Sequence, residues 1–154
     1  MSFFINPLGD QLDRALESWR WIGIEGKEPI RVTAFGDVFF TDSEGLVWFL
    51  DTLEGTFSAV FDSTEEMDQV LETEDGQAKF LLAELVKRAE AGGMHLNHGE
   101  CYDWKLNPVV GGAVEFENVH TIDCVVAINI AGQIHDQTRH LPPGTKISGF
   151  NVVD

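Results

Sequence analysis

The stretch "IRVTAFGDVFFTDSEGLVWFLDTLEGTFSAVF", residues 30–61, decides the fold class of this chain. Short runs of β-branched and aromatic residues alternate in it with turn residues, which is typical of antiparallel strands joined by tight connections. "TDSEG" with Gly45 and "TLEG" with Gly55 have the composition of hairpin turns. We therefore predict a meander over 30–61, with strands near 31–35, 37–41, 46–50 and 56–61.

Helical patterns lie on both sides of this meander. "NPLGDQLDRALESWRW" places its leucines and Trp19 on one stripe, which predicts an amphipathic N-terminal helix over 7–21. Ser63 and Glu66 have the spacing of a capping box, so a helix is expected over 64–73. Residues 77–91 carry apolar side chains in helical register before a glycine pair and predict a further helix.

The end of the chain returns to strand-type composition. "AVEFENV", "DCVVAINIAGQIHDQT" and "TKISGFNVV" are rich in β-branched residues, and we predict C-terminal strands over 113–153. A length of 154 residues is enough for one domain to bury its own core. The expected fold is therefore a single α+β domain, 1–154, with a largely antiparallel twisted β-sheet packed against about three helices.

The charge is concentrated in the first half of the chain. The formal net charge is -16, and residues 1–75 hold 17 acidic and 4 basic side chains, a balance of -13. No Lys or Arg occurs between Arg31 and Lys79. Direct contact with nucleic acid is therefore disfavoured, because phosphate binding needs cations, and a basic partner is favoured. No secretory signal or membrane span is evident, so a cytoplasmic location is expected.

"MHLNHGEC" places His95, His98 and Cys101 at intervals of three residues, and imidazole with thiolate is zinc-binding chemistry. A thiol enzyme could instead use Cys101 or Cys124 as the nucleophile, with His120 or His135 as the base. The spacing is weak evidence for either, because the segment follows a helix-ending glycine pair and no fourth ligand is apparent. The chain also lacks a phosphate-binding glycine motif. We expect no catalytic residue, metal or cofactor, and keep the metal or thiol enzyme as an alternative.

Acidic residues lie beside an aromatic residue at the predicted turns of the meander. Such an arrangement suits an acidic protein-binding surface. The residues predicted to bind a partner are Asp42, Glu44, Trp48, Asp51 and Glu54.

Three segments together resemble the C-terminal domain of type VI secretion immunity proteins that neutralise a DNase effector. They are "AFGDVFFTDSEGLVWFLD", "FDSTEEMDQVL" and "GECYDWKLNPVVGGAVEFENVHTIDCVVAINIAGQIHDQTRHLPPGTKI", and the similarity runs from Phe35 to Ile147. The early part is also similar to the broader SUKH superfamily of toxin-immunity proteins. The resemblance implies a non-enzymatic protein that binds and blocks a toxin, with a basic nuclease as the expected partner. An interaction domain with a non-toxin partner is a further alternative.

Under this resemblance the segment 99–123 has a structural role and is not an active site. Pro108, Gly111 and Gly112 are expected to turn the chain, Asn118 to satisfy backbone groups locally, and Cys101 to pack in the core.

Overall fold

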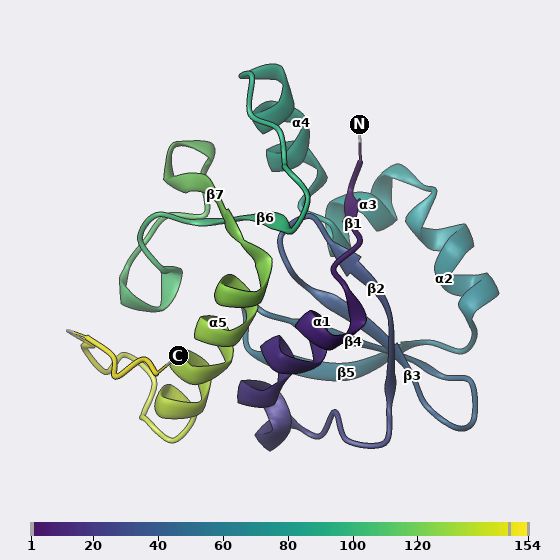
Figure 1. Cartoon of the computed structure of the whole chain (residues 1–154), viewed down its shortest axis with the longest axis horizontal. Helices are drawn as coiled ribbons and strands as arrows, with labels where there is room; N and C mark the ends of the chain where they lie inside the picture. The colour runs from purple at the N-terminus through teal and green to yellow at the C-terminus, as the bar shows by residue number, and fades with distance from the viewer. Residues whose placement is uncertain (1, 148, 154) are drawn as a thin grey trace.

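The computed structural model describes residues 2–147 and 149–153. Within these residues the largest unit is a five-stranded antiparallel sheet whose strands follow chain order (Figure 1). The strands are β1 (Phe4–Ile5), β2 (Glu28–Thr33), β3 (Val38–Thr41), β4 (Val47–Asp51) and β5 (Thr56–Phe61). The predicted meander and the α+β class are confirmed, whereas β1 has no counterpart in the sequence prediction.

The two predicted hairpin turns connect β3 to β4 and β4 to β5. Gly45 has a φ of 85° and Gly55 a φ of 71°, a left-handed conformation that side chains with a Cβ rarely adopt. Glycine is required at both turns for this reason, and the sequence pattern located them correctly.

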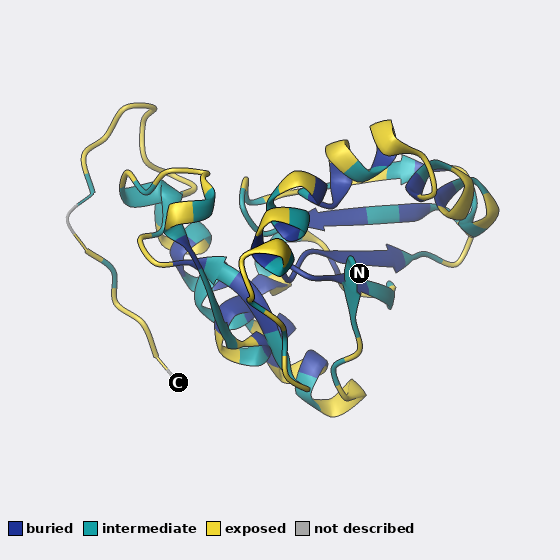
Figure 2. Cartoon of the chain, turned by 90° about the horizontal axis from the view of Figure 1, so that it is seen from above, coloured by how far each residue is buried: buried dark blue, intermediate teal, exposed yellow. Residues whose placement is uncertain are grey.

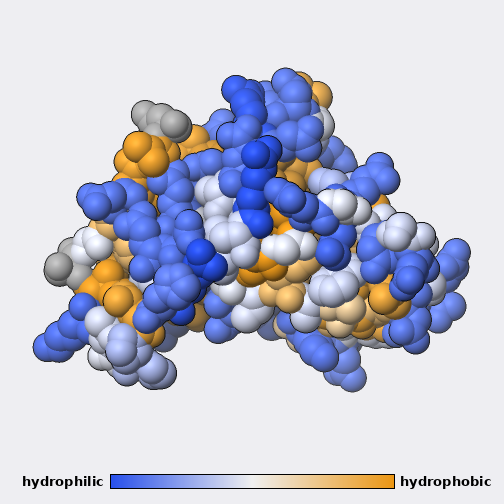
Figure 3. Space-filling view, turned by 90° about the horizontal axis from the view of Figure 1, so that it is seen from below, coloured by the Kyte–Doolittle hydropathy of each residue, from blue (hydrophilic) through white to orange (hydrophobic). Residues whose placement is uncertain are grey.

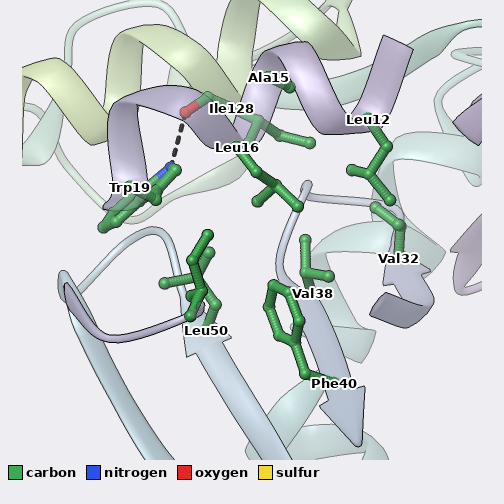
Figure 4. Close-up of a cluster of buried hydrophobic side chains, with 10 residues drawn as sticks. Leu12, Ala15, Leu16, Trp19, Val32, Val38, Phe40, Leu50 and Ile128 are labelled. Carbon is green, nitrogen blue, oxygen red and sulfur yellow. Dashed lines mark hydrogen bonds between the residues drawn. The ribbon is translucent and has the colours of Figure 1, made fainter. Parts of the chain in front are cut away.

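An N-terminal helical segment covers one face of the sheet. It comprises α1 (Gly9–Leu16) and a 3-10 helix, η1 (Glu17–Ile22). Trp19 is fully buried against Leu50, and its indole Nε1 donates a hydrogen bond of 2.8 Å to the Ile128 carbonyl (Figure 4). Burial of such a side chain contributes about 1.5–3 kcal/mol. The predicted helix over 7–21 is present, with 3-10 geometry in its second half.

The helices α2 (Thr64–Leu71) and α3 (Glu74–Phe80) cover the opposite face. Phe39 and Phe49 lie on this face, and both contact the Phe80 ring. The sheet is thus buried on both sides, with exposed residues on the outer faces of the helices (Figure 2). At the start of α2, Ser63 accepts from the Glu66 N–H as predicted. The Glu66 carboxylate reaches back to the N–H of Asp62.

The continuous helix predicted over 77–91 is wrong. The chain forms α3 and then a separate helix, α4 (Ala83–Ala91), and Leu82 between them has a φ of 49° and a ψ of 45°. The apolar residues share one helical register but serve two cores: Phe80 packs with the sheet, and Val86 packs beside Tyr102. The break at Leu82 changes the direction of the chain, so that α3 packs in one core and α4 in the other.

The strands predicted over 113–153 are largely wrong. A two-stranded sheet pairs β6 (Glu100–Trp104) with β7 (Val119–Asp123), and the next segment is a helix, α5 (Cys124–Thr138). Asp123 caps this helix by accepting from the N–H of Val126. Ile128 and Ile134 are buried, so tertiary packing overrides the strand preference of the β-branched residues. Beyond α5, no strand or helix occurs in residues 139–147 and 149–153.

The helices α1 and α5 approach each other closely. Ser18, just after α1, donates from Oγ to the Asn129 carbonyl at 2.7 Å. A Cβ on Gly132 would lie 2.1 Å from that Oγ, so only glycine fits. This contact fixes α5 against the N-terminal segment. No helix in the described part of the chain is long and apolar enough to cross a membrane.

Candidate functional site

The turn between β3 and β4 is organised by Asp42. Its Oδ1 accepts from the N–H groups of Glu44 at 2.9 Å and Leu46 at 3.1 Å, and its Oδ2 accepts from the indole Nε1 of Trp48 at 2.9 Å. The hydrogen bond from Trp48 is the main reason that the pKa of Asp42 is lowered. Asp42 is therefore a fixed, ionised acceptor that orients Trp48.

Trp48 is half-buried and forms part of an aromatic platform. Its ring stacks on Phe57 of β5 with centroids 5.1 Å apart. The ammonium Nζ of Lys27 lies 4.6 Å from the Trp48 centroid and 5.6 Å from the Phe57 centroid. This geometry is that of a cation–π contact. The platform, defined as Trp48 and Phe57, thus binds a cation from the same chain.

Asp51 organises the turn at the other end of β4. Its Oδ1 accepts from the N–H groups of Leu53 and Glu54, both at 3.0 Å. Asp42 and Asp51 flank opposite ends of the same strand, so the five predicted partner-binding residues form two groups. Glu44 lies with Asp42 and Trp48, and Glu54 lies with Asp51. The sequence pattern did not reveal this separation.

A larger group of acidic side chains lies on the outer surface of α2, α3 and their connections. Six of them are exposed: Asp62, Glu65, Asp68, Glu72, Glu74 and Asp75. Within the described residues, the one salt bridge of this group joins Asp68 to Arg31 at 3.6 Å. These residues form the negative stretch noted in the sequence, and the structure places them on the side of the sheet that α2 and α3 cover.

A buried carboxylate, Asp37, lies where the sheet meets the C-terminal helix. Its side chain accepts from the N–H and Oγ1 of Thr52 at 2.8 and 2.7 Å and from the Oγ1 of Thr33 at 3.3 Å. Burial and the nearby charge of Asp51 raise the pKa of Asp37 to about 7. The hydrogen bonds from Thr52 and Thr33 lower this pKa, but by less than the other two effects raise it. Asp37 is 4% exposed, and no pattern in the sequence predicted its burial.

His135 of α5 contacts the same segment from the other side. Its Nε2 lies 2.9 Å from the Thr52 carbonyl, and because a carbonyl only accepts, this nitrogen carries the hydrogen. Burial lowers the pKa of His135. A Cβ at Gly55 would lie 2.4 Å from the imidazole Nδ1. Thr52 therefore joins Asp37 of the sheet to His135 of the helix.

The histidines and cysteine considered for a metal or thiol site do not assemble into one. Cys101 is fully buried in β6, and burial raises the pKa of its thiol well above the usual value. His95 and His98 line a surface hollow with the N-terminal segment. In residues 2–147 and 149–153, no group of three His, Cys, Asp or Glu side chains has metal-binding geometry. A neutral buried thiol is also a poor nucleophile.

The segment 99–123 turns through a network centred on Asn118. The carboxamide of Asn118 accepts from the N–H of Leu106 and donates to the carbonyls of Leu106 and Ala113, at 2.8–2.9 Å. Pro108 begins a 3-10 helix, η2 (Pro108–Val110), and Gly111 follows it with a φ of 99°. A second 3-10 helix, η3 (Phe116–Asn118), leads into β7. A Cβ on Gly112 would lie 1.7 Å from the Leu106 carbonyl oxygen.

The fold and these surfaces define an α+β domain that presents exposed acidic side chains on its outer surface. Residues 62–135 match the family described as "T6SS immunity protein Tdi1, C-terminal". The resemblance to type VI secretion immunity proteins is therefore confirmed for this segment. A search of curated proteins found no match.

A solved structure shares the fold. The crystal structure of Atu4351 from Agrobacterium tumefaciens is 19% identical to this chain and superposes with a TM-score of 0.56. The similarity covers 84% of this chain and 65% of that chain, so this chain spans less than two thirds of its length. At this identity the comparison supports the fold.

Proposed function

We propose that this chain is a non-enzymatic, cytoplasmic immunity protein that binds and neutralises a toxin effector, and that the effector is a basic nuclease. The observation that carries the proposal is the match of residues 62–135 to a family of type VI secretion immunity proteins. The net charge of -16 supports a basic partner.

The acidic surface of α2 and α3 would steer the toxin toward the chain. Exposed carboxylates without a cationic neighbour keep their full charge toward an approaching protein, and such fields raise association rates. Asp42 and Asp51 are held by backbone hydrogen bonds, so they would present fixed charges at the two turns. Trp48 is the aromatic residue of the predicted partner-binding set and would supply an anchor at the turn held by Asp42.

The test is capture of a partner followed by a toxicity assay. The tagged chain is incubated with extract of its native cells at low and moderate salt, and proteins bound in stoichiometric amount are identified. Each is then produced in bacterial cells with and without this chain. Suppressed toxicity of a basic nuclease supports the proposal; a partner that is not toxic indicates an interaction domain of another kind.

The contribution of the acidic surface is tested with matched charge removals. The triple variant Asp62→Asn, Glu65→Gln, Glu72→Gln should slow association with the captured toxin about 3- to 10-fold at low salt and flatten its salt dependence. The control removes three exposed acidic charges elsewhere, with Asp13→Asn, Glu25→Gln and Glu115→Gln. Equal association rates for both triple variants would contradict steering by this surface.

A further inference from the structure

The strand β5 is the last strand of the sheet, and its outer edge is free. The strand order ends at β5, which pairs with β4 alone. In the described part of the chain, no side chain or loop hydrogen-bonds to the backbone of residues 56–61. Alternate N–H and C=O groups of an edge strand therefore face outward without a partner. The opposite edge of the sheet is β1, which is two residues long.

The side chains of β5 leave this edge open. Thr56, Ser58 and Ala59 are exposed, and residues 56–61 contain no charged residue and no proline. Natural edge strands are commonly protected by such residues or by a bulge. A bulge does occur at the end of β5. Trp48 pairs with Ala59 and Val47 pairs with Phe61, so Val60 has no partner on β4. Residues 56–59 keep a regular ladder and remain available.

The surroundings of this edge are acidic, and one face of the edge strand contacts a cationic side chain of the same chain. Exposed Glu54 precedes β5, and exposed Asp62 and Glu65 follow it. On one face of β5, the ammonium group of Lys27 lies over the aromatic platform of Trp48 and Phe57, which shows that cation–π contacts form next to this edge. Figure 1 draws β5 below β4, and the view from below in Figure 3 shows hydrophilic, neutral and apolar side chains intermixed on this side of the molecule.

We propose that the outer edge of β5 is a docking site for an extended, lysine- or arginine-bearing strand of a partner protein, which adds to the sheet as a sixth strand. Backbone hydrogen bonds to residues 56–59 would provide affinity, and the flanking carboxylates would select a basic strand. A second copy of this chain is disfavoured as the occupant, because each copy carries a charge of -16. That the partner is the toxin rests on the function proposed above.

A peptide titration tests the edge directly. The probe is a capped eight-residue peptide with alternating valine and threonine between paired lysines, and the control peptide has proline in place of each threonine. Both carry the same charge, but the control lacks the N–H group at every threonine position, and the fixed φ of proline disfavours a regular strand. We expect the probe to protect amides of residues 56–59 from hydrogen exchange and to bind about tenfold more tightly than the control. Equal affinities, or amide protection elsewhere, would overturn the proposal.

Variants of the edge separate this proposal from the immunity function. The double variant Ser58→Lys, Ala59→Lys should weaken probe binding about tenfold by repulsion, whereas Ser58→Glu, Ala59→Glu should retain it. The original chain and the lysine variant are also compared for protection of cells from the captured toxin. If both protect equally, the toxin does not bind at β5 and the docking proposal fails. The immunity function would still stand. If the original chain gives no protection, the immunity function fails and the peptide titration alone decides whether β5 accepts a strand.

Discussion

Replacing Asp37 with asparagine should stabilise the protein at neutral pH. Asp37 has its pKa raised from 3.8 to about 7, chiefly by burial. An asparagine keeps one oxygen to accept from Thr52, and its NH₂ group can donate to the Thr33 hydroxyl, which has acceptor capacity. The substitution thus removes a buried charge without removing its hydrogen-bonding partners.

The magnitude follows from linkage between protonation and folding. Because the folded pKa of Asp37 is higher than the unfolded one, its stabilising contribution is complete below pH about 4 and is lost as the pH rises toward 7. The full loss is about 4 kcal/mol, from about 1.4 kcal/mol per unit of pKa shift. The asparagine variant lacks this titration. Its stability advantage over the original chain should therefore grow by roughly 3 kcal/mol between about pH 5 and pH 8.

Urea unfolding of both proteins at several pH values between about 5 and 8 measures this difference. Asp42→Asn is the control of opposite sign. The pKa of Asp42 is lowered from 3.8 by its hydrogen bonds, so the stability contributed by its charge is lost only as the pH falls below the range measured. Asp42→Asn should therefore destabilise the protein by an amount that does not change between about pH 5 and 8. If the stability difference for Asp37→Asn is the same at about pH 5 and pH 8, Asp37 is already ionised in the folded protein and the reasoning is refuted.

Three further predictions concern packing and the turn segment. Gly132→Ala should lower the free energy of unfolding by about 1–3 kcal/mol, because the added Cβ meets Ser18; an unchanged urea midpoint would contradict the close crossing. Asn118→Ala should cost about 1 kcal/mol in the same assay, because three exposed hydrogen bonds are lost and water can reach the freed backbone groups, whereas Asn118→Asp should retain only the bond in which its oxygen accepts. Cys101 and Cys124 should react with a thiol reagent only on unfolding, since burial raises the pKa of both thiols; fast labelling of the folded protein would show that a site is open.

The meander could be predicted because its signals are local. Glycines at the turns and alternation of apolar residues are determined by backbone geometry over a few residues, so Gly45 and Gly55 were located correctly. The helix α5 could not be predicted in this way. Its β-branched composition favours a strand, and the deciding factors are the cap by Asp123 and the packing of Ile128 against Trp19.

The candidate site was predictable in composition but not in geometry. The sequence shows that acids accompany Trp48, but not that Asp42 holds the indole while Asp51 lies at the other end of β4. The burial of Asp37 depends on contact with Thr52, fifteen residues away in the chain. Contacts of this kind arise from the assembled sheet and leave no pattern in a single sequence.

Residues outside the segment that matches the immunity family form hydrogen bonds to that segment. Trp19 and Thr52 each form a hydrogen bond to α5, and the Ala34 carbonyl accepts from Tyr102 of β6 at 2.8 Å. These three residues belong to the first 61 positions, whereas the matching segment begins at residue 62. The acidic meander and the family segment therefore share one hydrogen-bonded framework. A partner that binds at β5 would contact a strand whose position is fixed from both halves of the chain.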